Sequence, residues 1–167
     1  MSKLYLQNIV DDTSFESLPA KWHGFDFGRF SKDKTLFDFQ KQGLKNALKA
    51  LWLYFKGNTP SANADTPLLK GNLFKCYQAN GFTENFDYNL SRERKTAKYL
   101  LEYDKDYPIT NSKISFAYFI NRMSFWMATG SGKTLIIVKL IEFLGKLIAE
   151  KELPERDILF LAHRDDL

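Results

Sequence analysis

MATGSGKT, residues 127–134, is the stretch of sequence that decides the fold. It follows a short apolar run at 124–128 (SFWMA). It precedes residues 133–151, which carry apolar side chains nearly all round a predicted, well-buried helix. A second continuous apolar run, 158–162 (ILFLA), has the pattern of a parallel strand covered on both faces. Strand, glycine turn, helix and strand in this order predict a right-handed βαβ unit.

The glycine turn has the chemistry of a phosphate-binding loop. Gly130 and Gly132 allow the backbone to bring several N–H groups toward one point, at the positive end of the following helix. Lys133 would reach the β- and γ-phosphates of a nucleoside triphosphate, and the Thr134 hydroxyl would ligate Mg²⁺. A turn that only joins a strand to a helix is the alternative. The predicted binding residues are Thr129, Gly130, Ser131, Gly132, Lys133 and Thr134, with Thr134 as the metal ligand.

The loop also resembles a known motif. With Met127 where the general pattern has glycine, it looks like the Walker A motif of superfamily 2 helicases and translocases, closest to the motor subunits of type I and type III restriction enzymes. The resemblance implies an α/β fold: a partial RecA-like P-loop lobe, with a parallel sheet, flanking helices and an α-rich insertion. It also implies an ATP-dependent DNA translocase or helicase that uses ATP and Mg²⁺, with Lys133 as the catalytic residue.

A second segment, residues 36–44 (LFDFQKQGL), opens a helix that the sequence predicts from Asp38 to a stop at Gly57. It is similar to the adenine-recognising segment of these motors, in which an aromatic residue precedes a glutamine at the head of a helix. The resemblance implies that Gln40 reads the adenine edge through its amide, which can donate and accept together. The alternative is that Gln40 is simply a polar residue in the first turn.

The last segment, residues 158–167, resembles the strand and loop that follow the P-loop helix in these motors. There a loop like His163-Arg164 touches the nucleic-acid backbone, so the resemblance implies that Arg164 contacts DNA. Pairing of Arg164 with Asp165 or Asp166 is the alternative.

The resemblance divides the chain into four parts: an irregular segment at 1–35, the adenine-recognition helix at 36–57, an insertion at 58–120, and the start of the ATPase core at 121–167. In the insertion, residues 92–103 (RERKTAKYLLEY) predict a basic helix that either contacts DNA or is a solvated face. The sequence lacks the downstream acidic pair and second lobe that hydrolysis needs in this family. We therefore expect an N-terminal fragment that binds ATP weakly and does not turn it over.

Other functions stay open on the sequence alone. One is a stand-alone P-loop nucleotide-binding module or small kinase, although a kinase usually has its P-loop near the N-terminus. Another is a non-functional remnant.

Composition excludes several further classes. Lys and Arg number 24 against 20 Asp and Glu, and this net charge of +4 permits a polyanionic partner without demanding one. With one Cys and two His, the chain can form neither an internal disulfide nor a zinc site of Cys/His spacing. No apolar stretch fits a signal peptide or a membrane span, so we expect a cytoplasmic protein with no membrane partner. The partners that the resemblance implies are double-stranded DNA and methyltransferase or specificity subunits.

Overall fold

The computed structural model describes residues 5–56, 75–82, 85–87, 109–110, 113–115 and 123–159 of the 167-residue chain. The chain divides into two compact units. One, which we call the insertion unit, comprises Met1–Thr13 and Leu53–Phe125. The other, which we call the loop unit, comprises Ser14–Trp52 and Trp126–Leu167, and it contains the glycine turn.

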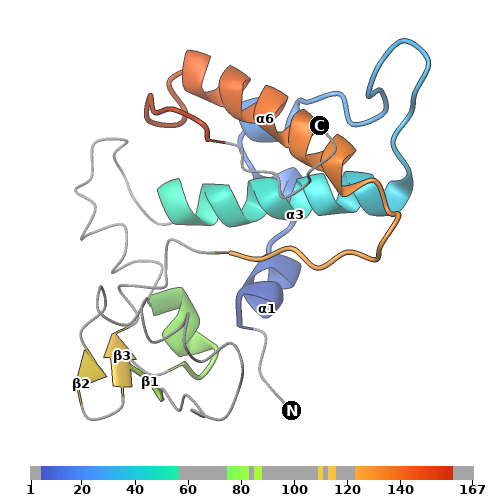
Figure 1. The fold of residues 1–167 in the computed structure, drawn as a ribbon. Helices are drawn as coiled ribbons and strands as arrows, with labels where there is room; N and C mark the ends of the chain where they lie inside the picture. The colour runs from blue at the N-terminus through green and yellow to red at the C-terminus, as the bar shows by residue number, and fades with distance from the viewer. Residues whose placement is uncertain are drawn as a thin grey trace. The chain divides into compact units, whose positions relative to one another are not determined.

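Two helices form the frame of the loop unit (Figure 1). α3 spans Asp38–Phe55 and α6 spans Lys133–Ala149, close to the bounds that the sequence predicts. The two helices come close at Gly43, where a Cβ atom would lie 4.0 Å from the Cδ1 of Ile136. Each helix buries one stripe of apolar side chains at three- and four-residue spacing. The buried stripes are Leu44, Ala47 and Leu48 on α3, and Ile136, Phe143 and Leu147 on α6.

Residues 14–30, which we call the N-terminal strap, pack against the second half of α6. The strap, part of the segment expected to be irregular, contains two single-turn helices, η1 (Phe15–Ser17) and α2 (Ala20–His23). The ring of Phe25 stacks on that of Phe143, with centroids 4.3 Å apart. The fully buried Trp22 donates its indole N–H to Glu152, just beyond α6, at 3.1 Å. Aromatic contacts thus order the strap even though its helices are too short to show a sequence period.

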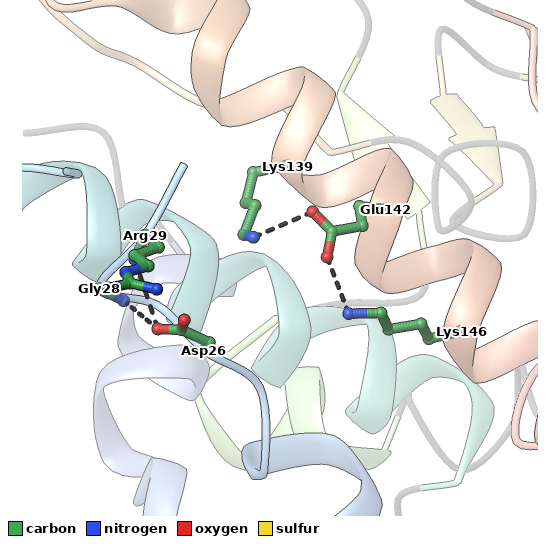
Figure 2. Close-up of polar contacts among 6 residues, drawn as sticks. All are labelled: Asp26, Gly28, Arg29, Lys139, Glu142 and Lys146. Carbon is green, nitrogen blue, oxygen red and sulfur yellow. Dashed lines mark hydrogen bonds and ion pairs between the residues drawn. The ribbon is translucent and has the colours of Figure 1, made fainter. Parts of the chain in front are cut away.

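A turn at the end of the strap is fixed by Asp26. Its Oδ1 accepts hydrogen bonds from the backbone N–H of Gly28 at 2.8 Å and of Arg29 at 3.3 Å (Figure 2). Aspartate favours such turns because its short side chain can bond backbone groups two residues on. The turn leads the chain from the strap toward α3.

The insertion unit is described in part. It contains α1 (Tyr5–Asp12), a helical turn at 75–79, and three short strands, β1 (Asn85–Asp87), β2 (Ile109–Thr110) and β3 (Lys113–Ser115). The strands pair in the order β1-β3-β2, and both pairings are antiparallel. Phe82 lies at the centre of a small core with Tyr5, Leu53, Tyr54 and Tyr77 packed around it. Burial raises the pKa of the Tyr77 hydroxyl to about 12.

The predicted fold class is wrong for the part of the chain that the structure describes. No parallel strand pairing occurs there, and the strands that do occur belong to the antiparallel sheet of the insertion unit. The runs expected as parallel strands, 124–128 and the described residues 158–159, have no regular structure. An apolar run becomes a strand only when neighbouring strands satisfy its backbone groups. The insertion, expected to be α-rich, contains in its described part this sheet as well as the helical turn at 75–79.

The burial expected for α6 needs a correction as well. Val138 is 48% exposed and Ile137 is 37% exposed, whereas Lys139 is buried. The face of α6 toward α3 and the strap is covered, so side-chain position on the helix decides burial more than polarity does.

Candidate nucleotide-binding site

The glycine turn has the backbone geometry of an anion-binding loop. Gly130 and Gly132 have φ angles of 76° and 74°, in the left-handed region that glycine adopts without strain. The N–H of Ser131 donates to the carbonyl of Ala128 at 3.3 Å, which closes the turn. Gly132 is the N-cap of α6, and its carbonyl accepts from the N–H of Leu135 at 3.0 Å. The N–H groups of Lys133 and Thr134 come before Leu135, at the end of the helix where backbone donors have no carbonyl partner within it, so they can bond a ligand.

Lys133 bridges the start of the loop and the start of the helix. Its Nζ donates to the carbonyls of Met127 at 3.0 Å and Ala128 at 2.8 Å. The first turn of α6 contains no acidic residue, and no side chain caps its end. A lysine at the positive end of a helix dipole is unfavourable unless an anion lies nearby. The local charge therefore suits a phosphate, and the neighbouring Thr134 is exposed.

Gln40 lies directly on this loop. Its Nε2 donates to the carbonyl of Ser131 at 2.8 Å, and its Oε1 accepts from the backbone N–H of Phe37 at 2.9 Å. Phe37 is the residue before α3, so the second bond is the glutamine half of a capping box. The side chain is only 3% exposed. The structure thus brings Gln40 to the predicted site from a distant part of the sequence, with both ends of its amide bonded to protein.

Two aromatic rings beside Gln40 were not among the predicted site residues. Phe37 is 67% exposed and Phe39 is 51% exposed, and their rings stack with centroids 5.8 Å apart and an angle of 9°. Neighbouring exposed apolar side chains can mark a surface that binds a ligand or partner. The sequence pattern of an aromatic before the glutamine could have indicated them, because it places one ring just before α3 and the other on its first turn.

The other charged side chains of α6 form ion pairs with one another. Glu142 lies between two lysines, 2.8 Å from the Nζ of Lys146 and 2.9 Å from that of Lys139 (Figure 2). Hydrogen bonds from Lys146 and Lys139 hold the pKa of the Glu142 carboxyl below its ordinary value. Lys139 also lies 5.3 Å from the centroid of the Phe143 ring. Lys133, in contrast, contacts backbone carbonyls at the loop.

The remaining predicted residues divide into two groups. Thr129 and Gly130 are exposed on the turn, while the Oγ of Ser131 is buried without a hydrogen-bond partner. Arg164, the predicted DNA contact, and the basic segment 92–103 lie outside the described residues.

Within the described ranges, no group of three or more His, Cys, Asp or Glu side chains could hold a metal ion. In the same ranges, no helix has the length and apolar character to cross a membrane.

Comparison with known protein families decides the affiliation of the chain. Residues 78–167, more than half of the sequence, match the family described as "Type III restriction enzyme, res subunit". The chain belongs to this family. No curated protein and no solved structure matches the chain. In this member of the type III restriction enzyme res subunit family, the matched stretch includes the glycine turn and α6. Gln40 lies outside the matched stretch but contacts the loop in the folded chain.

Proposed function

We propose that the chain forms the ATP·Mg²⁺-binding part of an ATP-dependent DNA translocase or helicase subunit of a restriction endonuclease, of type I or type III. One observation carries this proposal: two left-handed glycines, the start of α6 and the ammonium of Lys133 meet at one turn. Backbone N–H groups at a helix N-terminus, together with a lysine, are the donors that bind the phosphates of nucleoside triphosphates. The family match favours the motor over a small nucleotide kinase.

Each loop residue has a distinct part in this proposal. The N–H groups of the turn and of the first residues of α6 bind phosphate oxygens. Lys133 moves its ammonium from the carbonyls of Met127 and Ala128 toward the β- and γ-phosphates, where it offsets their charge. The hydroxyl of Thr134 and phosphate oxygens would hold Mg²⁺, which typically takes few protein ligands and keeps several waters. When bound, Mg²⁺ neutralises charge on the transferred phosphoryl group.

The adenine base has two candidate contacts on the first turn of α3. Gln40 donates one of its two amide hydrogens to Ser131, so a second amide hydrogen remains for an acceptor on the base. The exposed rings of Phe37 and Phe39 offer an apolar face on which a base can stack. The assignment of adenine selectivity to Gln40 stays a prediction.

The test is ligand-induced stabilisation against thermal unfolding. Binding to the folded state raises the melting temperature by mass action, so ATP with Mg²⁺ should stabilise the wild-type chain. Lys133→Ala should abolish that shift. Lys146→Ala is the matched control, because it removes a lysine of the same helix that pairs with Glu142, and it should keep the shift. Equal shifts for the wild type and Lys133→Ala would show that the loop is not the binding site.

DNA contact is tested separately. Anisotropy of labelled duplex DNA should show binding that weakens as salt is raised, because phosphate contacts release counterions. Binding that does not change with salt, or no binding at low salt with or without ATP, would contradict the DNA part of the proposal.

A further inference from the structure

One side chain joins the two helices of the loop unit at the glycine turn. Gln40 accepts from the N–H of Phe37 at the head of α3 and donates to the carbonyl of Ser131 inside the turn. Its burial means that water does not readily replace either bond. A single amide therefore couples the start of α3 to the conformation of the loop.

The packing at Gly132 makes this contact tight. A Cβ atom at Gly132 would lie 2.6 Å from the Nε2 of Gln40, closer than real Cβ contacts come. At Gly130, by contrast, a Cβ atom would meet nothing within 4 Å. Both glycines have left-handed φ angles, but only at Gly132 does the missing side chain also make room for Gln40. The amide thus packs on the residue from which α6 starts.

We propose that Gln40 is a positioning residue for the phosphate loop, which it holds in the binding conformation before any nucleotide arrives. This proposal rests on the proposed function, because it assigns a role at the same site. A loop held in advance loses less conformational entropy when the ligand binds, so affinity rises without a new contact to the ligand. The phosphates benefit from this effect whichever base is attached to them.

A ligand without a base separates this role from adenine recognition. Tripolyphosphate with Mg²⁺ carries the phosphates alone, so a residue that only reads adenine has no influence on its affinity. Gln40→Met keeps the side-chain length while it removes both hydrogen bonds. Gln42→Met is the matched control, because Gln42 is an exposed glutamine on the same turn that bonds to Asn46.

The experiment is calorimetric titration of each variant with Mg·tripolyphosphate and Mg·ATP, at a temperature where circular dichroism shows all proteins folded. Gln40→Met should raise the dissociation constant for Mg·tripolyphosphate roughly tenfold, the typical effect of losing one buried hydrogen bond. It should raise the dissociation constant for Mg·ATP by at least the same factor, and by more where Gln40 also contacts the base. Gln42→Met should bind like the wild type. If Gln40→Met does not fold, Gln40→Asn serves instead, because an amide one methylene shorter cannot make both bonds.

Two outcomes would overturn the proposal, one by excluding only the positioning role and the other by excluding nucleotide binding at the loop. Wild-type affinity of Gln40→Met for tripolyphosphate would overturn the positioning role alone and leave nucleotide binding intact. A wild-type chain that binds neither ligand, or a Lys133→Ala variant that binds both normally, would overturn the proposed function and this role with it.

Discussion

The side-chain amide of Gln40 donates to the carbonyl of Ser131 at 2.8 Å, across a separation of 91 positions in the sequence. This bond places the first turn of α3 against the turn that precedes α6. The start of α3, with its two exposed aromatic rings, therefore lies next to the loop that carries Lys133. Two expected outcomes concern this start of α3, and two concern the packing and charge of α6.

Adenine selectivity is the first of these. If the second amide hydrogen of Gln40 contacts the base, Gln40→Ala should narrow the preference for ATP over GTP, by about tenfold for one lost hydrogen bond. The measurement is the ratio of the two dissociation constants in the wild type and the variant. An unchanged ratio would retire the adenine role, whatever happens to the absolute affinities.

Base stacking is a separate property, carried by Phe37 and Phe39. Replacing either ring with alanine should weaken ATP binding by roughly tenfold, because stacking on an aromatic ring stabilises a bound base. Tripolyphosphate affinity should not change, which makes it the internal control. Equal weakening of both ligands would indicate that the rings support the loop instead of the base.

Phe143 should be a main source of stability in the loop unit. It is fully buried, and it contacts Phe25 and Phe27 of the N-terminal strap. Phe143→Ala should lower the free energy of unfolding by about 3–5 kcal/mol, measured by urea denaturation. The matched control is Val138→Ala on the exposed face of the same helix, which should change it by about 0.5 kcal/mol or less. Similar effects of the two changes would mean that the strap does not pack on α6 as described.

The pairing of Glu142 predicts a specific pH dependence. Its pKa is lowered in the folded chain, so its contribution to stability is present above its ordinary value of 4.5 and is lost as pH falls through the folded value. Glu142→Gln should therefore be less stable than the wild type at neutral pH, by about 1 kcal/mol or less because the carboxylate is partly exposed. The difference should close in acid. Unfolding measured from about pH 7 to about pH 3 checks this, and a difference independent of pH would contradict it.

The sequence predicts the elements with a strong local pattern and misses those that depend on distant contacts. The apolar spacing gives α3 and α6 close to their observed bounds, and the glycines at 130 and 132 have the left-handed conformation that a phosphate loop needs. The sequence shows no period in the N-terminal strap. Its order depends on the stacking of Phe25 on Phe143, and such a distant contact leaves no local pattern.

The parallel sheet is structure that the sequence predicts and the described residues do not form. The apolar residues at 124–128 and 158–159 have the composition of strands but no regular structure, because composition does not supply the neighbouring strands that a sheet requires. The predicted contact between Gln40 and adenine rests on the resemblance to superfamily 2 motors alone. The sequence could not show that the amide is buried and bonded to Phe37 and Ser131, since that geometry arises only when α3 and α6 are brought together.

If the loop at 127–134 binds the phosphates of ATP, its backbone amides must respond to the nucleotide. The most direct test is nuclear magnetic resonance of the backbone amides of Gly130, Gly132, Lys133 and Thr134 during titration with Mg·ATP. These amide signals should shift and saturate together in the wild type but not in Lys133→Ala. Signals at these four residues that stay unchanged while other amides respond would contradict phosphate binding at the loop.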